Sequence, residues 1–159
     1  MIVAPHQRLI ERDPQLRSVL DTISGLPHVH VDLDSFAMVD GSYTGQADIY
    51  LGDTSSQVVE FLMQPRPCVF LDNYQTDWRQ TNDHGFWACG EVVQRFDRIM
   101  AALIDAPSRH DRYLPIQRVY VAAALGDCGP EAPVRAAQVI LQGLSQERTS
   151  NPRARSATA

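Results

Sequence analysis

The chain has 159 residues, of which 44% are hydrophobic, and this length and composition predict a single globular domain with its own core. Its formal net charge of -5 argues against a nucleic acid polymer as a partner, because binding to a phosphate backbone needs clustered basic side chains. The sequence shows no apolar run as long as a membrane span and no signal peptide, so we expect a cytoplasmic protein that meets membranes only through a partner.

Apolar segments typical of strands alternate with helical patterns along the chain. The predicted strands cover residues 2–4, 28–32, 49–51, 67–71 and 91–93. The predicted helices cover residues 14–24, 55–64, 97–104, 115–125 and 133–144. Strands separated by helices favour right-handed crossovers, so we expect an α/β three-layer Rossmann-like domain with a mostly parallel sheet of about five strands. This domain is expected to cover residues 1–145, with a disordered tail at residues 146–159.

The most informative stretch is the turn Asp53-Thr54-Ser55-Ser56, which follows an apolar strand and precedes a helix. The Thr54 hydroxyl and the Gln57 side chain have the spacing of a capping box, which leaves other amides of the first helical turn available to a ligand. One interpretation is a phosphate site, and the other is a well-capped structural helix. A position at the carboxyl end of a parallel strand favours the phosphate site.

Two side chains are candidates to complete such a site. His6 follows the first strand, where an imidazole can donate to a phosphate oxygen or stabilise a leaving group; the alternative is a surface histidine. Glu60 lies about one turn beyond Ser56 and can accept hydrogen bonds from a ribose diol; the alternative is a solvent-facing helix residue. Both candidates are therefore defined by position alone.

Other residues permit more than one interpretation. Asp32 and Asp34 form a D-x-D pattern beside His28 and His30, but no third ligand is indicated, so we expect neither a metal nor a redox cofactor. The loop from Tyr74 to Trp87 is aromatic, and its rings either line a ligand site or cover the sheet. The rings in question are Trp78, His84, Phe86 and Trp87. The three cysteines lack metal-type spacing and are expected to be reduced.

The pattern of Ala47-Asp48, an apolar strand, Asp53-x-Ser55-Ser56, Glu60 and Pro65-x-Pro67 resembles a known family. It is similar to the carboxyl-terminal half of two-domain B-type glycosyltransferases, especially the CDP-glycerol glycerophosphotransferase-like group. The resemblance implies a nucleotide-diphosphate donor at Asp53, Thr54, Ser55 and Ser56, with His6 near the phosphate of the transferred group and Glu60 on the ribose. Thr54 stands where the family usually has an aromatic residue, and Gln7 where proline is commoner.

The resemblance implies a donor-binding domain of a transferase that acts on cell-envelope glycans. In that family the acceptor and usually the catalytic base belong to an amino-terminal domain, so we expect a truncated chain that is inactive alone and pairs with the missing domain or with itself. Apolar residues of the last two predicted helices are the expected docking surface. The alternative is a non-catalytic nucleotide-binding or protein-interaction module.

Overall fold

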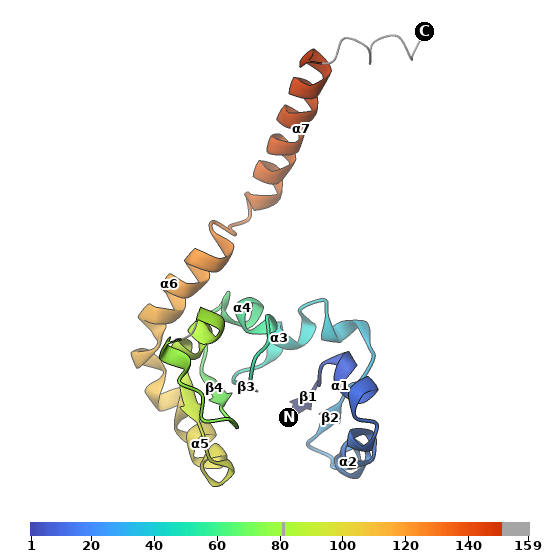
Figure 1. Cartoon of the computed structure of the whole chain (residues 1–159), viewed down its shortest axis with the longest axis vertical. Helices are drawn as coiled ribbons and strands as arrows, with labels where there is room; N and C mark the ends of the chain where they lie inside the picture. Colours follow the sequence, from blue (N-terminus) through green and yellow to red (C-terminus); the bar gives the residue numbers. More distant parts are fainter. Residues whose placement is uncertain (81, 151–159) are drawn as a thin grey trace. The chain divides into compact units, whose positions relative to one another are not determined.

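The computed structural model describes residues 1–80 and 82–150, and the chain divides into two compact units, Met1–Val121 and Ala122 onward (Figure 1). The division falls within helix α6 (Leu114–Leu125) and does not coincide with the boundary predicted at residue 145. Helix α7 (Ala132–Ser150) extends past the predicted start of the tail, since Gln, Glu and Arg in this segment favour helix. The rest of the predicted tail, residues 151–159, lies outside the described residues.

Strands form where the apolar runs predict them, and every pairing between them is parallel. They are β1 (Ile2–Val3), β2 (His30–Val31), β3 (Tyr50–Gly52), β4 (Cys68–Leu71) and β5 (Glu91–Val93). The α/β class is therefore confirmed. The single sheet of about five strands is not formed in the described chain, where β1 pairs with β2 and a separate sheet has the order β3-β4-β5. Pro5, which has no amide hydrogen, follows β1 closely and limits its ladder to two residues.

Short helices connect the strands of the first unit. The α-helices are α1 (Gln7–Arg12), α2 (Gln15–Ser24), α3 (Ser42–Gln46), α4 (Gln57–Leu62) and α5 (Ile99–Arg109). The 3-10 helices are η1 (Phe36–Met38), η2 (Trp78–Gln80), η3 (Asn82–Cys89), η4 (Phe96–Arg98) and η5 (His110–Arg112). Helix α2 begins as predicted after Asp13-Pro14, and the Asp13 carboxylate accepts the Gln15 amide at 3.1 Å. Helix α1 was not predicted, because its cap is an unusual one, His6.

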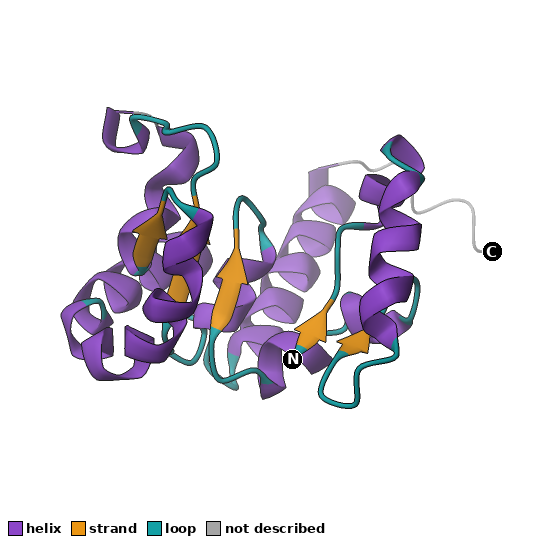
Figure 2. Cartoon of the chain, turned by 90° about the horizontal axis from the view of Figure 1, so that it is seen from below, coloured by secondary structure: helices purple, strands orange, loops and turns teal. Residues whose placement is uncertain are grey.

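The three-stranded sheet has apolar packing on both faces, with helices around its strands (Figure 2). On one face, the stripe of α4 predicted from its spacing is fully buried, with Val58, Phe61 and Leu62 at 0% exposure. On the other face, Val69 packs against Ala102 and Ala106 of α5. Phe86 and Trp87 are buried on the first face, so these two rings of the aromatic loop cover the sheet, whereas Trp78 and His84 are only half-buried.

Buried acids in this core make alkaline stability a test of the fold. Burial raises the pKa of the Cys68 thiol, raises that of Cys89 to about 11, and raises that of Tyr50 to about 12. In the unfolded chain thiols ionise near pH 8.5 and tyrosine near about pH 10, so above these values the folded state binds more protons than the unfolded state. The stability that these shifted groups contribute is therefore fully present below about pH 8.5 and is lost as the pH rises toward 11.

We expect the free energy of unfolding, measured with urea at several pH values from 8 to 10, to fall as the pH rises. The slope approaches about 1.4 kcal/mol per pH unit for each shifted group that is ionised in the unfolded chain and still protonated in the folded chain. Cys89→Ala should reduce this slope. Cys128→Ala removes an exposed thiol and should leave it unchanged. Equal slopes for Cys89→Ala and the unaltered chain would contradict the burial of this thiol.

Candidate functional site

The predicted phosphate site lies on the turn between β3 and α4. Strand β3 ends at Gly52, so the turn extends from the carboxyl end of an edge strand of the three-stranded sheet. Asp53, Thr54 and Ser56 are exposed and Ser55 is half-buried. The structure therefore presents four of the predicted site residues together at the edge of the sheet where ligands of parallel α/β proteins collect.

The capping box predicted for Thr54 and Gln57 is wrong. Helix α4 begins at Gln57, whose amide donates to the Ser55 hydroxyl at 3.2 Å. The Gln57 side chain turns away from the helix start and donates to the Met38 carbonyl oxygen of η1 at 2.5 Å. A contact with a residue far away in the sequence thus replaces the local bond that the spacing suggested.

The amides available to a ligand also differ in position from those expected. In the first helical turn, the amides of Val58 and Val59 donate to the carbonyl oxygens of Ser55 and Ser56, at 3.3 and 3.1 Å. The amides of the preceding residues 54–56 lie outside the strand and the helix, and in the described chain none of them donates to a protein acceptor. The free donors therefore belong to the turn itself, one step before the helix.

Trp87 fixes the beginning of this turn. Its indole Nε1 donates to the carbonyl oxygen of Asp53 at 2.9 Å, and the side chain is 3% exposed. Tyr50 lies beneath the same turn, where its ring would meet any side-chain carbon added to Gly52. The turn thus rests on two packed aromatic side chains. The sequence patterns indicated Trp87 as part of an aromatic surface, but they did not indicate its hydrogen bond to the turn.

His6 and Glu60 each have surroundings of their own in the structure. His6 is the cap of α1, and its Nδ1 accepts the Arg8 amide at 3.2 Å. In the described chain no hydrogen bond or ion pair joins His6 to the turn. Glu60 is exposed and lines a cavity of about 20 Å³ together with Ala4, which lies just before Pro5 and His6. Ala4 and Glu60 therefore line one small cavity, and the role of His6 stays a prediction.

The carboxylate of Asp32 is used within the protein. It accepts hydrogen bonds from the amides of Asp34 and Ser35, from the Ser35 hydroxyl, and from the Tyr43 hydroxyl at 2.5 Å. These bonds, that of the Ser35 hydroxyl above all, hold the pKa of Asp32 far below its usual range. His30 Nε2 lies 2.9 Å from the same Tyr43 hydroxyl. Among the described residues, no three acidic, histidine or cysteine side chains are grouped to hold a metal ion.

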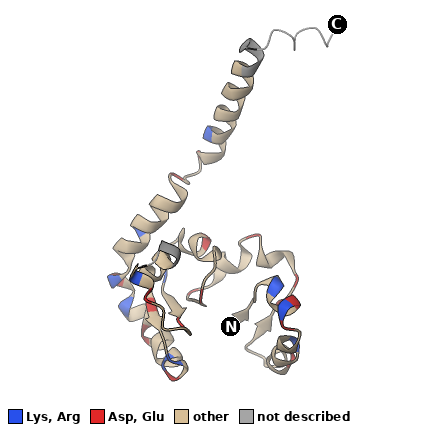
Figure 3. Cartoon of the chain, viewed as in Figure 1, with Lys and Arg blue, Asp and Glu red and all other residues tan. Residues whose placement is uncertain are grey.

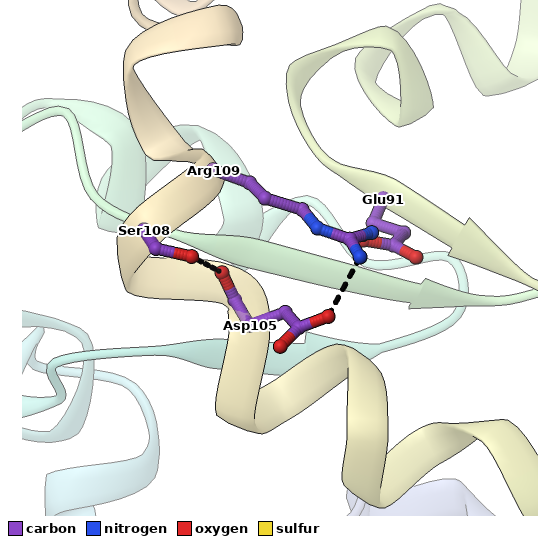
Figure 4. A network of polar contacts seen from close by, with 4 residues as sticks. All are labelled: Glu91, Asp105, Ser108 and Arg109. Atoms are coloured by element: carbon purple, nitrogen blue, oxygen red, sulfur yellow. Dashed lines mark hydrogen bonds and ion pairs between the residues drawn. The ribbon is translucent and has the colours of Figure 1, made fainter.

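A second, larger cavity of about 550 Å³ lies beside the start of β5. Arg109, at the end of α5, crosses its wall and bridges Glu91 and Asp105 at 2.8 and 2.6 Å (Figure 4). The other residues that line this cavity include Arg79 and Arg112, which the sequence analysis did not identify. The sequence does contain a signal for these two arginines, because each is adjacent to an aromatic residue, in Trp78-Arg79 and Arg112-Tyr113.

Comparisons of the chain with protein-family models, with curated proteins and with solved structures found no match. Within the described residues, no helix combines the length and the apolar character needed to cross a membrane.

Proposed function

We propose that the unit Met1–Val121 binds the diphosphate of a nucleotide-linked donor at the turn 53–56. The observation that supports this is the run of three successive amides, at residues 54–56, that donate to no acceptor in the described chain. They follow a parallel strand and lie among hydroxyl side chains, an arrangement suited to an anion with several oxygens. With the family resemblance, this observation supports the unit as the donor-binding domain of a glycosyltransferase or glycerophosphotransferase-like protein that acts on cell-envelope glycans.

We also propose a Rossmann-like relation between the two sheets. Strands β1 and β3 each have one edge unpaired in the described chain, and they are the neighbouring strands of the two sheets in Figures 1 and 2. The resulting order, β2-β1-β3-β4-β5, reverses its direction between β1 and β3, which is where open α/β sheets bind ligands. His6 follows β1 and the turn follows β3, so this order supports His6 near the transferred phosphate and Glu60 near the ribose.

Ser56→Pro tests the amides of the turn. Ser56 has φ -64° and its amide has no described acceptor, so proline fits the backbone and removes a donor without breaking an internal bond. We expect stability within about 0.5 kcal/mol of the unaltered chain. Affinity for CDP, UDP, ADP and GDP, measured by calorimetry, should fall about tenfold for whichever of them binds, because a hydrogen bond to a charged group is lost.

Ser56→Ala is the matched control, because it removes the hydroxyl and keeps the amide. It should weaken binding less than Ser56→Pro. If no nucleoside diphosphate binds the unaltered chain, or if Ser56→Pro binds as tightly as the unaltered chain, the turn is not the diphosphate site.

A further inference from the structure

The cavity beside the start of β5 has the chemistry of a second ligand site. It is lined by the start of β5 and by residues near the ends of α5 and η2. It thus lies toward the amino end of its strand, whereas the turn 53–56 lies at the carboxyl end of β3. The cavity and the turn are therefore separate sites, and both contact the buried side chain of Trp87.

Charge is unevenly compensated around this cavity. The guanidinium of Arg109 is paired twice, with Glu91 at 2.8 Å and with Asp105 at 2.6 Å. Arg79 and Arg112 are exposed and form no salt bridge with any side chain that the structure describes. Arg79 and Arg112 thus line the cavity without an ion-pair partner, while the single charge of Arg109 is shared between the carboxylates of Glu91 and Asp105. In a chain with a net charge of -5, this is a local surplus of positive charge. Basic segments also gather around the junction of α5 and α6 in Figure 3.

Aromatic rings stand beside both of these arginines. The guanidinium carbon of Arg79 lies 4.5 Å from the centre of the Trp78 ring, and that of Arg112 lies 6.0 Å from the centre of the Tyr113 ring. Trp87 supplies a further ring, and it meets Trp78 edge to face at 6.2 Å between ring centres. Flat side chains of this kind provide contact area for a planar ligand, while the guanidinium groups bind oxygen anions through paired N–H donors.

We propose that this cavity binds a phosphomonoester attached to a planar ring. A phosphomonoester carries about -1.5 to -2 charge at neutral pH, which matches the two uncompensated guanidinium groups better than a carboxylate does. The ring of the ligand packs against Trp78 and Tyr113, and the buried Trp87 supports Trp78 from behind. A volume of about 550 Å³ is within the range of about 300 to 1,000 Å³ that small-molecule sites occupy.

Tryptophan fluorescence measures this binding directly, because the chain has 2 tryptophans and both line the cavity. Phenyl phosphate is the minimal probe, inorganic phosphate lacks the ring, benzyl alcohol lacks the charge, and benzoate replaces the phosphate with a carboxylate. We expect a saturable change with phenyl phosphate, at lower concentration than with any of the other three. Arg79→Gln and Arg112→Gln should each weaken phenyl phosphate binding about tenfold.

Arg17→Gln is the matched control. It removes the same charge from an exposed position of α2 that does not line the cavity, and it should leave the phenyl phosphate affinity unchanged. Absence of a saturable response to phenyl phosphate would overturn the inference, as would equal weakening by Arg17→Gln. Equal binding of benzoate would overturn the assignment to a phosphomonoester.

The two sites are separated by a cross-test. Ser56→Pro should leave phenyl phosphate binding unchanged. If Arg79→Gln weakened the binding of a nucleoside diphosphate and Ser56→Pro did not, the nucleotide would occupy the arginine-lined cavity. The proposed function at the turn would then fail while this inference would stand.

Discussion

Arg66→Met is expected to destabilise the first unit by about 3 kcal/mol, because one guanidinium satisfies several backbone carbonyls. These carbonyls terminate two helices, with Thr44, Gly45 and Ala47 at the end of α3 and Phe61 and Gln64 at the end of α4. The shortest of the bonds, to Ala47, is 2.5 Å. The guanidinium also lies 4.0 Å from the centre of the Phe61 ring. A positive charge at two helix carboxyl ends is electrostatically favourable, and methionine keeps only the apolar stem.

In Arg66→Met, the five carbonyl oxygens lose their protein donor, and only water can hydrogen-bond to them. The site is only partly buried, so the expected loss is smaller than the sum of five unsatisfied groups. A loss of about 3 kcal/mol lowers Tm by roughly 6 to 12 °C for a chain of this size. Arg66→Lys keeps a charge but cannot reach all five acceptors, so it should fall between methionine and the unaltered chain.

Urea denaturation measures this effect, with Arg17→Met as the control for loss of an exposed arginine on α2. Arg17→Met should remain within about 0.5 kcal/mol of the unaltered chain. An Arg66→Met variant as stable as Arg17→Met would mean that the guanidinium does not hold the ends of α3 and α4 together.

Local patterns predicted the elements of this fold better than their long-range pairing. The apolar run at residues 67–71 became β4 (Cys68–Leu71), and the helical stripe of Val58, Phe61 and Leu62 is buried as its spacing indicated. These features depend on side-chain period and burial, which neighbouring residues determine. The pairing of strands depends on contacts distant in sequence, so the division into two sheets could not be derived from the apolar runs.

The candidate site follows the same rule. The turn 53–56 lies between a strand and a helix as predicted, because an apolar run followed by polar hydroxyl residues defines that boundary. The choice of donor amides could not be predicted, since Gln57 binds the Met38 carbonyl, nineteen residues away in the sequence. The arginine-lined cavity could not be predicted either, because Arg79 and Arg112 meet across it from separate elements.

Trp87 connects the two candidate sites. Its ring lines the arginine-lined cavity, and its Nε1 donates to the carbonyl oxygen of Asp53 at the head of the turn. One buried side chain thus contacts both sites.

Gly90→Ala is expected to destabilise the same core by about 3 kcal/mol, at the upper end of the cost of overpacking. A Cβ at this position would clash with the Cys68 carbonyl oxygen and would lie 2.7 Å from the Cys68 Cβ. Gly90 directly precedes β5, and the pairing of Val69 with Glu91 sets it opposite Cys68 of β4. The clash involves backbone, so relief requires β4 and β5 to move apart rather than a side chain to rotate.

Gly90 also lines the arginine-lined cavity, so Gly90→Ala should weaken phenyl phosphate binding as well as stability. Gly85→Ala is the matched control, because a Cβ there meets nothing within 4 Å. Gly85→Ala should remain within about 0.5 kcal/mol of the unaltered chain in urea denaturation. Equal stability of Gly90→Ala and Gly85→Ala would show that β4 and β5 do not approach as closely as this packing requires.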